Sequence, residues 1–113
     1  MAFGRKRKAS GRLFAVGDIH GCVDELAALM RSIAPGRGDT VVFVGDYVDR
    51  GPDSKGVLEL LIDLAKHCQL VSILGNHDDL MLHARESDAK FQLWMKCGGT
   101  GALDSYQGPD RIA

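Results

Sequence analysis

Gly45-Asp46-Tyr47-Val48-Asp49-Arg50-Gly51 is the most informative stretch of the sequence. It follows the run from Val41 to Val44, which is short, rich in β-branched residues and flanked by glycine, so the run predicts a strand buried on both faces. Parallel α/β sheets bind ligands just beyond the carboxyl ends of their strands. Two carboxylates and a guanidinium at such a place are costly unless a divalent metal and a phosphate compensate them. The stretch therefore predicts a site for charged ligands.

The same arrangement occurs twice more along the chain. The apolar run from Leu13 to Val16 leads into Gly17-Asp18-Ile19-His20-Gly21, and the run from Leu70 to Leu74 leads into Gly75-Asn76-His77-Asp78. Each strand thus ends in a glycine followed by side chains that bind metals. Because the carboxyl ends of parallel strands meet at one edge of a sheet, one shared site is the simplest interpretation.

Helical periodicity fills the segments between and after these strands. Helices are predicted from Val23 to Ile33, from Ser54 to near His67, from Asp79 to about Arg85 and from Lys90 to Cys97. In the second helix Ser54 is the expected N-cap. Its inward face is expected to comprise Val57, Leu58, Leu61, Ile62 and Ala65. Residues 100–113 show no clear period. The alternation predicts an α/β fold with a parallel βαβαβα core and right-handed crossovers.

Length and composition limit the classes of protein to consider. The chain has 113 residues, 45% of them hydrophobic, which fits one domain, expected over residues 12–113. A net charge of -1 argues against a nucleic-acid or membrane-surface binder, and no apolar stretch reaches the roughly 20 residues of a membrane span. Residues 1–11 are expected to form a flexible basic tail. Three scattered cysteines indicate neither a disulfide framework nor a zinc site, and a cytoplasmic location is expected.

The three clusters offer ligands for a divalent metal. Asp18, His20, Asp46 and Asn76 supply carboxylate, imidazole and amide groups, which suit manganese, iron or zinc. If Asp46 bridges two ions, Asp18 and His20 would hold one ion and Asn76 would begin the shell of the other. Two metals about 3.5 to 4 Å apart can generate a hydroxide nucleophile and hold both oxygens of a transferring phosphoryl group.

The remaining motif residues suit phosphate chemistry. Arg50 offers a bidentate fork for phosphate oxygens. His77 is placed to protonate the leaving oxygen, with Asp49 orienting its imidazole. Taken singly, such residues are equally typical of glycine turns and surface ion pairs. Their joint occurrence after three apolar runs favours the functional interpretation. Asp78 is expected to lie in the first turn of a helix rather than to bind metal.

The three motifs closely resemble the leading motifs of the calcineurin-like metallophosphoesterases. The ending Val48-Asp49-Arg50-Gly51 resembles the serine/threonine phosphoprotein phosphatase branch, particularly its bacterial and phage members. The resemblance covers roughly residues 12–108 and implies the N-terminal half of an α/β/β/α sandwich. It also implies two divalent ions, usually manganese, and hydrolysis of phosphate monoesters by a metal-bound hydroxide. The implied substrate is a phosphoprotein or a small phosphate ester, held by Arg50 and Asn76, with His77, Asp49 and Arg50 as catalytic residues.

Two departures from the family pattern leave alternatives open. Asp78 stands where the eukaryotic phosphatases typically have glutamate, so a diadenosine tetraphosphatase-like hydrolase is the second reading. The family completes its second metal with later histidines, whereas no histidine follows His83 here. A truncated, inactive metal-binding fragment is the third reading. Half a sandwich exposes an apolar sheet face, so self-association is expected.

Overall fold

The computed structural model describes residues 11–107 and contains a three-stranded sheet followed by a helical region. Its elements in chain order are β1 (Leu13–Val16), α1 (Val23–Ile33), β2 (Thr40–Phe43), α2 (Ser54–Leu64), β3 (Gln69–Ser72), α3 (Asn76–His83), the 3₁₀ turn η1 (Ala84–Glu86), α4 (Asp88–Trp94), the π turn η2 (Met95–Gly99) and α5 (Thr100–Tyr106). The predicted parallel βαβαβα core is confirmed. The basic run at residues 5–8 lies outside the described residues, so the expected flexible tail stays a prediction.

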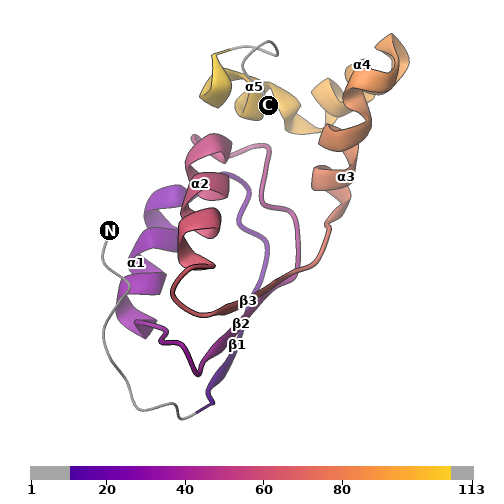
Figure 1. The fold of residues 1–113 in the computed structure, drawn as a ribbon. Helices are drawn as coiled ribbons and strands as arrows, with labels where there is room; N and C mark the ends of the chain where they lie inside the picture. Colours follow the sequence, from indigo (N-terminus) through magenta and orange to yellow (C-terminus); the bar gives the residue numbers. More distant parts are fainter. Residues whose placement is uncertain (1–10, 108–113) are drawn as a thin grey trace.

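The sheet has the order β1-β2-β3 with both pairs parallel. Leu13 pairs with Thr40, and Thr40 pairs with Gln69, so the three strands start level and end level. Figure 1 shows α1 and α2 together on one side of the sheet, and α3 to α5 beyond the strand ends. Val41 and Phe43 are fully buried against the two crossover helices. This packing delivers the three motif loops to one edge.

The opposite face of the sheet is not covered by any described element. Strand side chains alternate between the two faces, and the members of this second face remain open to solvent. Leu13 is 71% exposed, Val44 is 44%, Val71 is 47% and Ile73 is 49%. The prediction that the central strand is buried on both faces is therefore wrong for the described residues, because only one face has helices against it.

Helix α2 buries Val57 and Leu61 as predicted, but the rest of its inward face differs from the prediction. Val57, Leu60, Leu61 and Leu64 are buried at the i, i+3, i+4, i+7 spacing, whereas Ile62 is 67% exposed. The predicted N-cap is also wrong by one residue. The Asp53 side chain accepts a hydrogen bond from the Gly56 amide at 2.8 Å, as an N-cap does.

The C-terminal helices differ most from expectation. Helix α3 begins at Asn76 rather than Asp79, so the third motif forms the first turn of the helix. The predicted helix from Lys90 to Cys97 starts at Asp88 and does not end at the glycines. It passes through the π turn, where Gly98 has φ 105°, into α5. Although the sequence shows no clear period from residue 100 onward, Thr100–Tyr106 forms this helix. None of the helices in residues 11–107 has the length and apolar character to cross a bilayer.

Candidate metal centre and active site

The three motif loops touch one another through their glycines. A methyl group on Gly51 would lie 1.8 Å from the carbonyl oxygen of His20. A methyl group on Gly75 would lie 2.1 Å from the amide nitrogen of Asp46. No other residue type fits at such distances from rigid backbone atoms. The glycine that leads or closes each motif is therefore what lets the three loops form one site.

Four residues of the first two loops have left-handed backbone conformations. The φ angles are 43° at His20, 56° at Asp46, 76° at Asp49 and 69° at Arg50. Such conformations cost on the order of 1 kcal/mol or more each for residues with a Cβ, and they concentrate at functional sites. Hydrogen bonds hold the strained turns: the amides of Ile19 and His20 both donate to the Asp46 carbonyl, at 3.1 and 2.9 Å.

The structure brings together three of the four predicted metal ligands. Asp18, His20 and Asp46 each offer one ligand atom, and these three atoms all lie within 4.8 Å of one another. His20 Nδ1 lies 2.9 Å from the Val48 carbonyl oxygen, which can only accept a hydrogen bond. Nδ1 therefore carries the proton, and Nε2 is left as a lone-pair donor 3.8 Å from Asp18 Oδ2. A carbonyl that fixes the tautomer in this way is a common feature of metal-binding histidines, so these residues fit a divalent ion.

Asn76 and Arg50 lie in the loops that carry this cluster. Asn76 is the exposed first residue of α3, and the next amide, that of His77, donates to Asp46 Oδ1 at 2.8 Å. The Arg50 side chain is exposed, and its amide donates to the Gly98 carbonyl at 3.2 Å. Asn76 therefore stands beside Asp46, whereas Arg50 precedes Gly51, which lies against the His20 carbonyl, and has its own side chain open to solvent. Their roles toward metal and phosphate stay predictions.

His77 and Asp49 form a buried pair next to the metal cluster. His77 Nδ1 lies 3.0 Å from Asp49 Oδ2, and the Asp49 side chain is fully buried. Burial raises the pKa of Asp49, while hydrogen bonds from His77 and Trp94 oppose the rise. The His77 ring meets the His20 ring edge to face, with centroids 4.8 Å apart. The pair can hold a proton at the edge of the metal cluster.

Asp78 has a role that sequence reasoning missed. It lies in the first turn of α3, as expected, and it is only 7% exposed. Its carboxylate accepts hydrogen bonds from the amides of Asp46, Tyr47 and Gly75, at 2.7, 2.9 and 2.9 Å. Asp78 thus fixes the second motif loop against the third. An acidic residue at the end of the third motif was the available signal, but its partners Asp46 and Tyr47 lie 32 and 31 residues earlier in the chain.

Trp94 is the second residue whose contact was not foreseen. Its indole nitrogen Nε1 lies 2.8 Å from both carboxylate oxygens of Asp49. The sequence places Trp94 in a helix 45 residues after Asp49, and nothing in the spacing indicates that the two meet. Trp94 is 2% exposed, so the contact is closed to water.

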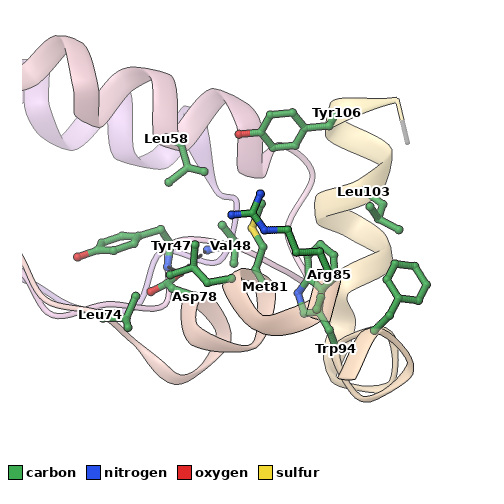
Figure 2. A pocket seen from close by; sticks show the side chains of 13 residues that line it. Tyr47, Val48, Leu58, Leu74, Asp78, Met81, Arg85, Trp94, Leu103 and Tyr106 are labelled. Carbon is green, nitrogen blue, oxygen red and sulfur yellow. Dashed lines mark hydrogen bonds between the residues drawn. The ribbon is translucent and has the colours of Figure 1, made fainter. Parts of the chain in front are cut away.

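A cavity of about 470 Å³ opens on the helical side of the second motif. Its walls are mostly apolar and include Val48, Met81 and Trp94. Figure 2 shows the Arg85 side chain reaching into the cavity between Tyr106 and Met81. The cavity offers an apolar surface with one cation beside the turn that carries Asp49.

Comparison with known proteins supports the assignment that the motifs suggest. The family model described as calcineurin-like phosphoesterase matches residues 11–109. Serine/threonine-protein phosphatase 1 of Salmonella typhimurium is 40% identical over 88 residues, which cover 77% of this chain and 38% of that protein. The symmetrical bis(5'-nucleosyl)-tetraphosphatase of Enterobacter sp. (strain 638) is 46% identical over 67 residues, covering 58% of this chain and 23% of that protein.

A solved structure agrees with these relatives. A crystal structure of a protein provisionally named a diadenosine tetraphosphatase superposes with a TM-score of 0.59 at 42% identity, covering 76% of this chain and 37% of that one. The chain thus spans well under half the length of each of these relatives. The motifs, the fold and the matched model agree over nearly the whole sequence. The chain belongs to the calcineurin-like phosphoesterase family.

Proposed function

We propose that this protein hydrolyses phosphate monoesters in a metal-dependent reaction. The observation that carries the proposal is the cluster of Asp18, His20 and Asp46, with its fixed histidine tautomer, directly beside the buried pair of His77 and Asp49. Metal ligands next to a proton donor are what phosphoryl transfer to water needs. Family membership supports the same reaction class.

The roles of the individual residues follow from their chemistry. Arg50, which is exposed and belongs to the second motif, would hold two phosphate oxygens through its guanidinium fork. Divalent ions, when bound, lower the pKa of water and draw electron density from the phosphoryl group. As water forms the new P–O bond and loses a proton to solvent, the ester P–O bond breaks. His77 gives the Nε2 proton to the leaving oxygen, while Asp49 holds the Nδ1 side of the ring.

Two substrate classes follow from the relatives. A serine/threonine phosphoprotein is our first proposal, because the similarity to serine/threonine-protein phosphatase 1 extends over 77% of the chain. A bis(5'-nucleosyl) tetraphosphate is the second, because relatives with that name are 46% identical over the matched segment and the similar solved structure has the same kind of name. Manganese is the proposed ion. The three unpaired thiols support the proposed location in the reducing cytoplasm.

The second metal position distinguishes an active enzyme from an inactive one. Asn76 is the ligand that we propose for it within this chain, and no histidine follows His83 in the sequence. A protein that binds one ion and does not turn over substrate is the alternative from another class. Both the number of bound ions and the turnover therefore need to be measured.

The decisive experiment is manganese-dependent hydrolysis of 4-nitrophenyl phosphate by this chain and its Asp46→Asn variant. Asp24→Asn, which removes an exposed carboxylate from the first turn of α1, is the matched control. We expect turnover by the wild type and by Asp24→Asn, and a loss of at least about a hundredfold in Asp46→Asn because ligand removal disrupts the metal centre.

Two further measurements sort the alternatives. Titration calorimetry with manganese gives the number of bound ions, and one ion without turnover would establish the inactive reading. Parallel assays with a phosphoserine peptide and with diadenosine tetraphosphate rank the substrate classes. Equal activity of wild type and Asp46→Asn would refute the metal-dependent mechanism.

A further inference from the structure

Trp94 donates a hydrogen bond to the carboxylate of Asp49, and this carboxylate in turn contacts His77, the proposed general acid. Its Nε1–H lies 2.8 Å from both Asp49 oxygens, and Asp49 Oδ2 lies 3.0 Å from His77 Nδ1. Trp94 and Asp49 are 2% and 0% exposed, so no water can replace the indole as hydrogen-bond donor without local opening. The chain of contacts therefore runs from α4 through the second motif to α3.

The Asp49 carboxylate has few other constraints. Its backbone amide donates to Ser54 Oγ at 3.0 Å, which fixes the main chain but leaves the carboxylate free to rotate. The His77 ring contacts one of the two oxygens, whereas the indole lies equidistant from both. Removal of the indole N–H would leave a buried carboxylate oxygen without a donor, which favours rotation or water entry.

The position of the indole is itself closely defined. A methyl group on Gly99 would lie 2.7 Å from ring atoms Cδ2 and Cε2 of Trp94, so the glycine lets the backbone pack flat against the ring. The neighbouring Gly98 accepts the Arg50 amide hydrogen bond at 3.2 Å. The end of α4 and the turn that follows it thus contact Asp49 through the Trp94 indole and Arg50 through the Gly98 backbone.

We propose that Trp94 is a positioning residue of the phosphoesterase reaction, which acts through Asp49 to aim His77 at the leaving oxygen. The proposal rests on the proposed function. The proposal also gives the π turn a role, because the turn places Gly98 and Gly99 against the second motif and against Trp94. His77 would donate its Nε2 proton as the ester bond breaks, and Trp94 would touch neither substrate nor metal.

The test uses two substrates that need the proton to different degrees. 4-Nitrophenyl phosphate has a leaving group that departs without protonation, whereas a phosphoserine peptide releases an alkoxide that needs a proton. In Trp94→Phe, which keeps an aromatic ring but loses the N–H, we expect kcat for the peptide to fall about tenfold or more. We expect kcat for 4-nitrophenyl phosphate to change less than about threefold, because general-acid catalysis contributes little to that reaction.

Phe91→Leu provides the matched control. Phe91 packs edge to face on Trp94, with ring centroids 6.3 Å apart, and its side chain has no group that could donate a hydrogen bond to Asp49. This variant should affect both substrates to the same degree. An equal loss on both substrates in Trp94→Phe would mean that Trp94 only supports packing, and the positioning role would be overturned.

A spectroscopic readout separates this inference from the proposed function. Trp94 is the sole tryptophan of the sequence, so one indole N–H resonance reports its hydrogen bond. We expect that resonance to move in Asp49→Asn, and the Nδ1–H resonance of His77 to broaden or vanish in Trp94→Phe. If the wild type hydrolyses neither substrate, the proposed function fails while these spectra still decide the structural link. An unchanged His77 Nδ1–H resonance in Trp94→Phe would overturn the link.

Discussion

Arg12 and Asp39 form a partly buried ion pair at the amino-terminal end of the sheet, opposite the proposed active site. Arg12 Nη2 lies 2.7 Å from Asp39 Oδ2, and Asp39 is 2% exposed. The Gly36 amide donates to the same carboxylate at 2.9 Å. The hydrogen bond from Arg12, followed by that from Gly36, holds the pKa of Asp39 well below its usual range. The carboxylate therefore ties β1 to the turn before β2.

The stability that this pair contributes should depend on pH in a defined direction. The pKa of Asp39 is lower in the folded chain than the roughly 3.9 of an unfolded chain. Its stabilising effect is thus fully present above about pH 4 and is lost as the pH falls below that value. We expect Asp39→Asn to lower the melting temperature at pH 7, and the difference from wild type to narrow between pH 4 and pH 3.

Thermal melts of both proteins from pH 7 to pH 3 check this expectation. Asp49 has a shift of opposite sign, since burial raises its pKa, but it is present in both proteins and cancels in the difference. Asp24→Asn, at an exposed position, serves as control. A gap in melting temperature that stays constant over the whole range would show that the charge of Asp39 is not what stabilises the fold.

At the scale of elements, apolar runs and helical periodicity predicted the three strands and the two crossover helices. The observed strand limits differ from the predicted ones by a residue or two; β2, for example, begins at Thr40 rather than at Val41. The inward face of α2 was misassigned because Ile62 and Leu60 are equally apolar in the sequence. Only the position of the helix on the sheet decides which of the two is buried. In the structure Leu60 is buried and Ile62 is exposed.

Helix α5 was missed because its local sequence is a poor helix former. The segment contains glycine, threonine and serine, which have low helix propensity. Tertiary contacts compensate for this weakness. Gly101 packs against the Gly51 carbonyl, with 3.2 Å from its Cβ position to that oxygen, and Ser105 Oγ accepts a hydrogen bond from the Lys55 amide at 3.1 Å. The helix is stable where it touches the second motif and the start of α2.

The site itself was predictable only in part. The candidate ligands Asp18, His20 and Asp46 were predicted to lie together because each belongs to a loop in which a glycine follows a strand, and the structure places them together. The contacts of Asp78 and Trp94 were not, because both residues act on loops far away in the sequence. Pairing across 31 and 45 residues depends on how the helices fold back, which no local pattern encodes.

The contact between the first two motif loops should be very sensitive to a single methyl group. In Gly51→Ala the new Cβ would lie 1.8 Å from the His20 carbonyl oxygen, so one of the two loops must move. We expect a loss of about 2 kcal/mol or more in the free energy of unfolding and weaker manganese binding. Urea unfolding and titration calorimetry measure both effects.

Gly17→Ala is the matched control for that experiment. Gly17 also belongs to a motif, but a methyl group there meets nothing within 4 Å. Its stability should stay within about 0.5 kcal/mol of wild type, as at an unconstrained surface position. Similar losses in the two variants would mean that flexibility of the glycines, rather than the close approach of the loops, is what matters.

At the scale of the whole molecule, the main open feature is the face of the sheet that no element within residues 11–107 covers. The exposed side chains of Leu13, Val44, Val71 and Ile73 alternate along the strands with the residues that face the helices, so they lie on the other face of the sheet. A continuous apolar strip of this kind is typical of an interaction surface. We therefore propose that chains of residues 1–113 associate through this face.

Light scattering behind size-exclusion chromatography tests the association. We expect an apparent mass that rises with concentration for the wild type and approaches the monomer value of 12.2 kDa for Ile73→Lys, which buries a charge in the interface. Ile62→Lys is the control, because Ile62 is 67% exposed but belongs to α2 on the other side of the molecule. A wild-type chain that remains monomeric at every concentration would contradict the proposal.

The indole that contacts Asp49 also forms a wall of the 470 Å³ cavity, and it is the sole tryptophan of the sequence. All of the tryptophan fluorescence of the protein therefore originates between the proposed acid pair and this cavity. Its emission wavelength reflects how dry the cavity is, and its intensity responds to the charge and geometry of the carboxylate. The intrinsic fluorescence of Trp94 can therefore report on the proposed active site without an added label.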